Sequence, residues 1–516
     1  MDRRFFLRIM ATLAACGATG GSFAANLPDS SSREYGSQTA SATDRLEKDS
    51  SVGSSTKAAV IGAGIAGLAA ARVLAQAGWQ VDVFEKNDSQ GGLCSTLVID
   101  GFTFDFGPHV FNKSITDLVP FKSGDLEAAT FSESFLVRNQ FLRFPNDLLS
   151  PGYAIDMFAA LAKNTLEPDR LSATNLEDLA KACYGEKVAT EIFQPLIEKW
   201  CKAPLNMLDH RYLASRMHGK LTAESIANHL KSIFIHTWKR VKNTTGQIGE
   251  SQKQAESVDP PGYSGRIGAK IIPHRLADGL PNVRFHFNQA VQSLAVDRGH
   301  VVRLQAGGME IQPDFVINTA PLNQLAGMLK GENRIQSLAK VSYLNIIFVF
   351  ARIQRPKLLN TEWTWIPEQY TPFYRMSEMK VFHANHAPED ATGLCLEITL
   401  ADDDTQLKEP AEYWEKLTRD FLDRVFSLKS REIIGIDVVK KDFAYPHFTL
   451  SNTRLIGKAL EQPYESGKTE HRFRTGIKNL AIAGRTGTFS YYLAPAAIVS
   501  GQKAAAEAIA FISGKT

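Results

Sequence analysis

The chain has 516 residues, enough for two or three domains with a large buried core. Its 58 lysines and arginines nearly balance its 55 aspartates and glutamates, and a net charge of +3 gives no reason to expect a nucleic-acid partner. The apolar share of 44% is that of an ordinary globular protein. After the N-terminal segment, no apolar run approaches the roughly 20 residues that span a bilayer.

The cysteines give no sign of a metal centre. They include no CxxC pair, and no histidine cluster has metal-ligand spacing, so we expect neither a zinc nor an iron–sulfur site. In an exported protein one disulfide among the last four is an open alternative, but we favour buried free thiols. The five positions are Cys16, Cys94, Cys183, Cys201 and Cys395.

Residues 1–25 resemble a twin-arginine export signal, with DRRFFLR at positions 2–8 followed by a short apolar stretch. That route carries proteins already folded around their cofactor. Three outcomes stay open: ordinary cleavage near Ala24, which we favour slightly, lipidation of Cys16, or an uncleaved membrane anchor. Residues 26–56 are rich in small polar side chains, so we expect a disordered linker there.

A dinucleotide-binding unit is predicted next. An apolar strand at 58–61 runs into the sequence GAGIAG at 62–67 and then into an alanine-rich helix. In this pattern Gly62 makes a tight turn, Gly64 lets the backbone approach a pyrophosphate, and Gly67 lets helix and strand pack closely. The pyrophosphate is expected on the N–H groups at the positive end of the helix dipole.

The residues that follow indicate which dinucleotide binds. A second strand over 79–84 ends at Glu85, where a carboxylate can receive ribose hydroxyls. The glycine pair 91–92 comes a few positions later. This combination resembles the FAD-binding signature of the flavoenzyme superfamily that holds glutathione-reductase-type and amine-oxidase-type proteins, which implies FAD rather than NAD. Many members have Arg or Lys after the glycine pair, whereas this chain departs with Leu93.

Two further segments resemble UDP-galactopyranose mutases and their protoporphyrinogen-oxidase-like relatives. DFGPHVF at 105–111 makes His109 a candidate neighbour of the isoalloxazine ring, with a core histidine as the alternative. GRTGTFSYY at 484–492, followed by a small-residue helix, resembles the C-terminal flavin motif of the mutases. Amine oxidases usually have an acidic residue where Arg485 stands. Tyr491 and Tyr492 are candidates for an aromatic wall of the substrate cavity, with plain packing as the alternative.

The middle of the chain is expected to build the substrate domain. Residues 135–145 alternate like a hairpin around Asn139-Gln140, on which Arg138 and Arg143 face either an anionic substrate or, more commonly, solvent. A helical region follows. Residues 340–400 should form long antiparallel strands that roof the substrate cavity.

We therefore expect an α/β protein with a Rossmann-like FAD-binding domain of the glutathione-reductase type and a discontinuous α+β substrate domain, an antiparallel sheet with helices. The FAD domain is expected to use residues 57–112, 262–330 and 470–514, and the substrate domain residues 113–261 and 331–469. The residues expected to contact FAD are Gly62, Gly64, Ile65, Ala66, Gly67, Glu85, Lys86, Gly91, Gly92, Leu93, Gly107, Pro108, His109, Val291, Gly484, Arg485 and Ala494.

The favoured function is an FAD-dependent oxidoreductase, similar to amine or protoporphyrinogen oxidases, that takes a hydride from a small organic substrate. The catalytic candidates are His109, Tyr491 and Tyr492. One alternative is a non-redox sugar mutase, but nucleotide sugars are cytosolic and the export signal argues against it. Another alternative is a flavin-binding module that only assembles with partners. The expected partners are a small-molecule substrate and the twin-arginine machinery, with a possible membrane tether through the N-terminus. The expected location is the periplasm, or the outer side of the inner membrane of a bacterium.

Overall fold

The computed structural model describes residues 56–107, 110–111, 113–129, 132–143, 174–210, 262–329, 333–460 and 476–514, with the single positions 153, 156 and 160. All of them belong to one of two compact units of the chain, the other being residues 1–41 and 213–257. The predicted export signal and nearly all of the predicted linker lie outside the described residues, as do most of the helical region after residue 153 and both Pro108 and His109.

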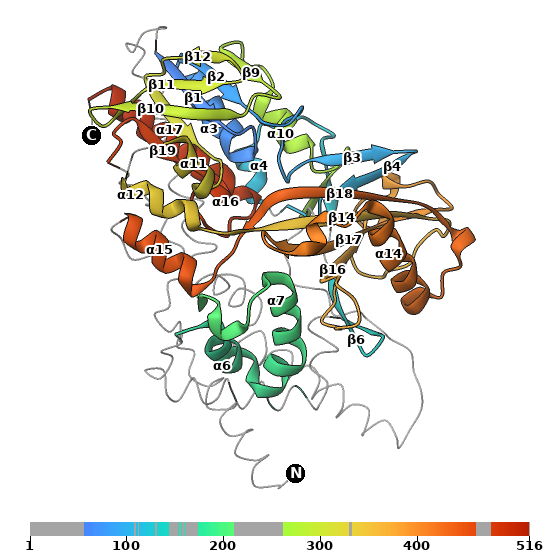
Figure 1. Ribbon diagram of the computed structural model, residues 1–516. Coiled ribbons are helices and arrows are strands. Elements are labelled where there is room, and N and C mark those ends of the chain that lie inside the picture. The colour runs from blue at the N-terminus through green and yellow to red at the C-terminus, as the bar shows by residue number, and fades with distance from the viewer. Residues whose placement is uncertain are drawn as a thin grey trace, which may run out of the picture. The chain divides into compact units, whose positions relative to one another are not determined.

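Five parallel strands form the first sheet, in the order β19-β13-β1-β2-β9. They come from three distant stretches of the chain (Figure 1). The central strands β13, β1 and β2 are mostly apolar and buried, as is usual when helices or other layers cover both faces of a parallel sheet. The bounds are β1 Lys57–Ile61, β2 Gln80–Phe84, β9 Val283–His286, β13 Phe315–Asn318 and β19 Leu480–Ile482.

Four helices share one apolar cluster with this sheet: α3 (Ile65–Gln76), α4 (Ser114–Leu118), α10 (Ile271–Ala277) and α17 (Ala494–Ile512). Helix α17, near the C-terminus, packs against α3, the helix that follows the first strand (Figure 1). The contact is tight, because a side-chain carbon added at Gly501 would lie 2.0 Å from the carbonyl oxygen of Ala66.

A separate three-stranded antiparallel sheet consists of β10 (Val291–Asp297), β11 (His300–Ala306) and β12 (Met309–Ile311). The short helix α11 (Leu322–Met328) contacts it. The buried side chain of Asn479, just before β19, donates to Val301 O at 2.9 Å and accepts from Val301 N at 2.7 Å. This pair of hydrogen bonds fixes the small sheet to the parallel one.

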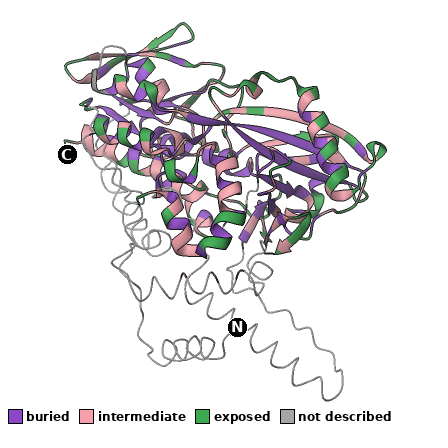
Figure 2. Cartoon of the chain, turned by 60° about the horizontal axis from the view of Figure 1, so that its bottom comes forward, coloured by how far each residue is buried: buried purple, intermediate pink, exposed green. Residues whose placement is uncertain are grey.

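The second large sheet has seven strands in the order β18-β14-β17-β16-β15-β6-β7, antiparallel except for the pair β6–β15. Helix α14 (Ala411–Phe426) covers one face through Trp414, Phe421 and Leu422. The long strands β14 and β17 are buried on both faces (Figure 2). The bounds are β6 Glu133–Val137, β7 Gln140–Arg143, β14 Tyr343–Ile353, β15 Trp363–Trp365, β16 Arg375–Glu378, β17 Thr392–Ala401 and β18 Ile433–Pro446.

The remaining elements are short. A hairpin joins β3 (Thr96–Ile99) to β4 (Phe102–Asp105), and β5 (Leu126–Ala129) pairs antiparallel with the distant strand β8 (Gly262–Gly265). The other helices are α6 Leu176–Val188, a π-helix Ala189–Phe193, α7 Gln194–Cys201, α12 Asn333–Gln336, α13 Met379–Phe382, α15 Leu450–Leu460 and α16 Gly484–Gly487. Single 3₁₀ turns cover Leu205–Met207, Ser337–Lys340, Ala384–His386, Thr405–Lys408 and Ser430–Glu432.

The predicted fold class is confirmed, and so are the long antiparallel strands after residue 340. One turn is corrected: the hairpin between β6 and β7 turns at Arg138-Asn139, one residue earlier than predicted, with φ angles of 53° and 59°. A two-residue hairpin with positive φ at both positions matches the twist of the strands. Arg138 lies at the surface with Glu191 at 3.6 Å, which favours the solvent interpretation.

The four cysteines within the described part of the chain are free. Among the described helices, none combines the length and apolar character that crossing a membrane requires.

We predict that Gly501→Ala destabilises the protein by about 1–3 kcal/mol, because the added methyl group overpacks the contact between α17 and α3. Denaturant unfolding measures this loss. The matched control is Gly327→Ala in α11, where no described atom lies within 4 Å of the added carbon, and alanine should be neutral or stabilising. Equal stability of the two variants would contradict the close packing.

Candidate functional site

The glycine-rich turn between β1 and α3 has the geometry that its sequence predicts. Gly62 has a φ of 100°, and an added side-chain carbon would lie 2.3 Å from Thr319 Oγ1. At Gly67 the same carbon would lie 2.0 Å from the carbonyl oxygen of Gly62. At Gly64, in contrast, no described atom lies within 4 Å of that carbon. Gly64 therefore faces open space, as expected where a ligand approaches the backbone.

The start of α3 is suited to an anion. Its first turn, which holds Ile65 and Ala66, contains no acidic side chain, so the helix has no carboxylate of its own at the positive end of its dipole. The first turn of α17, which begins at Ala494, also has no acidic side chain. A pyrophosphate at the first helix and developing negative charge at the second would both be stabilised.

Glu85 is buried at the end of β2 and its carboxylate is held in place beside the glycine turn. Its Oε2 accepts from Ala63 N at 2.9 Å, and its Oε1 accepts from Asn87 N at 3.0 Å and from Asn87 Nδ2 at 2.7 Å. Because a carboxylate offers about four acceptor positions, lone pairs remain for ribose hydroxyls. The role of Asn87 was not predicted from the sequence. The pattern that could have indicated it is an amide side chain two residues after Glu85.

The second glycine pair lies directly against Gly64. Gly91 N donates to Ala63 O at 2.9 Å, and Gly64 and Gly91 form an isolated bridge. Both glycines of the pair have positive φ angles, 114° at Gly91 and 60° at Gly92. Leu93 follows with its side chain half-buried. The extension after Glu85 thus borders the same open space.

The C-terminal glycine motif packs against α3. Gly484 has a φ of 78°, and an added carbon there would lie 2.9 Å from the Ala66 side chain. Thr486 Oγ1 donates to Thr319 O at 3.0 Å. Because Thr319 also packs against Gly62, the glycine turn after β1 and the glycine motif at 484–487 both contact Thr319.

Three other predicted contacts have defined places. Val291 begins β10 and is buried, and Gln289 N donates to Glu85 O at 2.8 Å, which brings the start of β10 close to Glu85. Lys86 is exposed, with its Nζ 5.5 Å from the centroid of the Phe443 ring. Gly107 has a φ of 90° and lies over the second large sheet. Pro108 and His109 lie outside the described residues and stay predictions.

A buried ion pair lies next to Gly107. Arg375 donates from Nε and Nη2 to the two carboxylate oxygens of Glu397, both at 2.7 Å, and Tyr374 donates its hydroxyl to Glu397 Oε2 at 2.7 Å. Burial disfavours the charged guanidinium, but the Glu397 carboxylate raises the pKa of Arg375 well above its ordinary value. An added carbon at Gly107 would lie 3.1 Å from Arg375 Nη2. The pair thus supports the segment that leads to His109.

Tyr491 belongs to an aromatic cluster. Tyr445 and Tyr491 stack with centroids 6.1 Å apart, and Trp200 of α7 meets both rings edge-on and stacks on Tyr374 at 5.7 Å. The Arg485 guanidinium carbon lies 5.1 Å and 5.3 Å from the centroids of the two stacked tyrosines. Sequence reasoning proposed Tyr491 for such a wall but missed Trp200, because no local pattern links α7 to the C-terminal motif.

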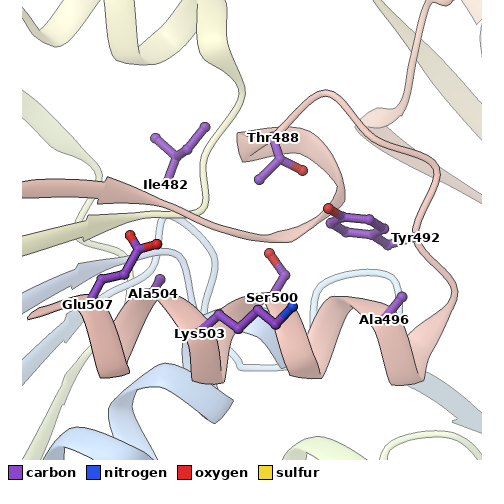
Figure 3. Close-up of a pocket in the computed structure, with 8 residues that line it drawn as sticks. All are labelled: Ile482, Thr488, Tyr492, Ala496, Ser500, Lys503, Ala504 and Glu507. Carbon is purple, nitrogen blue, oxygen red and sulfur yellow. The ribbon is translucent and has the colours of Figure 1, made fainter. Parts of the chain in front are cut away.

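Tyr492 lies elsewhere. It borders a small pocket on the surface of α17, where its hydroxyl and those of Thr488 and Ser500 point toward one another, with Lys503 and Glu507 further along the helix (Figure 3). Its backbone oxygen accepts two hydrogen bonds from Arg485, at 3.0 Å and 2.7 Å. The structure therefore groups Tyr491, but not Tyr492, with the aromatic cluster.

An open approach at Gly64, a fixed carboxylate on the next strand and a second glycine turn from the C-terminal end fit a dinucleotide that both ends of the chain enclose. Such a site is typical of proteins that bind FAD in a Rossmann-like domain. The chain belongs to the family of flavin containing amine oxidoreductases, whose family model matches residues 65–509. The predicted family resemblance and FAD as the cofactor are thereby confirmed, while the individual contacts remain predictions.

Curated relatives match over short stretches. A 4,4'-diapophytoene desaturase of Staphylococcus haemolyticus is 49% identical over 76 residues, 15% of this chain and 13% of the relative. A zeta-carotene-forming phytoene desaturase of Myxococcus xanthus is 55% identical over 51 residues, 10% of each chain. The chain thus matches only about a tenth of the length of these relatives.

Solved structures match over most of both chains. Reduced UDP-galactopyranose mutase superposes with a TM-score of 0.70 at 18% identity, covering 89% of this chain and 96% of the other. A protein assigned as protoporphyrinogen oxidase from Exiguobacterium sp. 255-15 gives 0.63 at 16%, covering 89% and 99%. Cyclohexylamine oxidase from Brevibacterium oxydans gives 0.59 at 16%, also covering 89% and 99%. At these identities the likeness concerns the fold alone.

We predict that Gly64→Ala weakens FAD binding at least about tenfold, or 1.4 kcal/mol, because its methyl group occupies the space into which the diphosphate must come. Fluorescence titration of the apoprotein with FAD measures the affinity. The thermal unfolding temperature of the apoprotein should stay unchanged, because no described atom touches the new methyl group. Gly67→Ala should lower that temperature instead. Wild-type FAD affinity in Gly64→Ala would refute the assignment.

Proposed function

We propose that this protein oxidises a C–N or C–C single bond of a small organic substrate to a double bond. A hydride leaves a C–H bond of the substrate for the flavin, and a proton leaves the neighbouring N–H or C–H. The observation that carries the proposal is the split dinucleotide site, open at Gly64 and bordered by the turn at 484–487. FAD, when bound, supplies the acceptor for the hydride. The start of α17 would stabilise negative charge at the reacting end of the cofactor. The desaturase names of the locally matching relatives support an oxidation.

The aromatic cluster would form a wall of the substrate cavity. Tyr445 and Tyr491 already have a cation against their rings, the guanidinium of Arg485. A second cation at the same place would meet like-charge repulsion. We therefore favour a neutral or anionic substrate over a protonated amine. Family membership alone does not fix this choice.

The second candidate is a flavin-dependent sugar mutase. The segments at 105–111 and 484–492 and the superposition on UDP-galactopyranose mutase support it. It differs in a measurable way, because a mutase works only after prior reduction of its flavin and produces no net oxidation.

We predict that under anaerobic conditions a neutral or anionic donor bleaches the visible flavin absorbance of the holoprotein, whereas protonated amines do not. A panel of porphyrinogens, amines and sugars covers the candidates, and absorbance spectra with product analysis provide the readout. Isomerisation of a sugar that requires prior chemical reduction would support the mutase instead. If the purified protein bound no flavin, both candidates would fall.

We further propose that the protein is exported by the twin-arginine route to the periplasm, either free or tethered through its N-terminus. The arginine pair at positions 3 and 4 supports this proposal. Replacing both by lysine, Arg3→Lys with Arg4→Lys, should leave the protein in the cytoplasm of a bacterial host, as fractionation and immunoblotting would show. Arg8→Lys is the control and should leave export intact. Unchanged fractionation of the double variant would refute the route.

A further inference from the structure

Lys441 lies beside the dinucleotide site although it comes from the other sheet. It is on β18, where it pairs with Ile346 of β14. Its Nζ is 4.3 Å from the centroid of the Phe106 ring, and Phe106 directly precedes Gly107. Burial lowers the pKa of Lys441, while the carboxylates of Asp88 and Glu85 act in the opposite direction. The amine is thus close to the loop that joins Glu85 to the second glycine pair.

This lysine is half-buried, and no carboxylate of a described residue lies within ion-pair distance of it. The carboxylates of Asp88 and Glu85 act on it only from further away. Its contact with the ring of Phe106 recovers only about 0.5–2 kcal/mol. Lysines are rarely buried without a partner, because the charge loses hydration. A half-buried cation without a direct ion-pair partner is therefore a candidate to bind an anionic ligand.

The neighbouring Lys440 provides the contrast. Successive side chains of a strand point to opposite faces of the sheet, so Lys440 and Lys441 face opposite ways. Lys440 is exposed and has Asp442 at 3.3 Å as its ion-pair partner. Lys441 lies on the face of Phe348, whose ring contacts Phe106 at 5.2 Å. The two lysines therefore differ in surroundings but not in charge.

We propose that Lys441 is a counter-ion for the diphosphate of FAD and supplies, from β18, the positive charge that the chain lacks at Leu93. The inference rests on the proposed function, because it needs FAD as the ligand. The carboxylates that act on Lys441 belong to Glu85 and Asp88, and the loop that holds them leads to Gly91, which bridges Gly64, where the diphosphate is expected. Lys441 is thus a cofactor-binding residue that joins the substrate-domain sheet to the dinucleotide.

The test compares FAD binding by the apoproteins of wild type, Lys441→Met, Lys441→Arg and the matched control Lys440→Met. Fluorescence titration at several salt concentrations gives the affinity and its salt dependence. We expect Lys441→Met to bind FAD at least about tenfold more weakly and with a smaller salt dependence. Lys441→Arg should keep most of the affinity because it keeps the charge, and Lys440→Met should match wild type.

Wild-type affinity in Lys441→Met would overturn the proposal while leaving the proposed function intact. Equal losses in Lys441→Met and Lys441→Arg would overturn it as well, because they would show that shape rather than charge matters. Failure of the wild-type apoprotein to bind FAD would instead refute the proposed function itself. Thermal unfolding of each apoprotein shows whether a lost affinity comes from a damaged fold. If Lys441→Met is damaged in this way, the FAD affinity of Lys441→Arg decides whether the charge is needed.

Discussion

The close contact between α3 and α17 is the constraint on which the rest of the structure depends. Gly501 allows α17 to approach the carbonyl oxygen of Ala66, and Gly484 allows the preceding turn to pack on the side chain of the same alanine. Both approaches require the absence of a side chain. They bring the N-terminal glycine turn and the C-terminal glycine motif to one place, so neither end of the chain completes the dinucleotide site alone.

The two large sheets contribute different kinds of group to this place. The parallel sheet supplies backbone: a turn with open space at Gly64, helix ends without acidic residues, and one carboxylate held by Ala63 and Asn87. The seven-stranded sheet supplies buried side chains, among them the ion pair of Arg375 and Glu397. Removing one partner of a buried ion pair typically lowers the free energy of unfolding by about 3–5 kcal/mol. This pair therefore holds in place the face of the sheet next to Gly107.

The parts of the site that could be predicted from the sequence are those that depend on residues close together in the chain. A glycine that needs a positive φ or a close approach is recognisable from its position after a strand, and Glu85 is recognisable from its place at the end of the next strand. The aromatic cluster could be predicted only in part: Tyr491 was a candidate, but Trp200 meets it only through packing between distant segments. Arg375, Glu397 and Lys441 could not be predicted, because their neighbours depend on strand register, which no local pattern specifies here.

The joining of α3 to α17 also has a consequence for the order of events during synthesis. The strand β1 and the helix α3 are made first, and most of the other described elements are made before their partners β19 and α17 follow. The gap between β1 and β2 is short, whereas closing the sheet at β13 and β19 joins segments that are distant in the chain. The dinucleotide site therefore forms after its first half has been made, and FAD can be enclosed only once α17 has been translated.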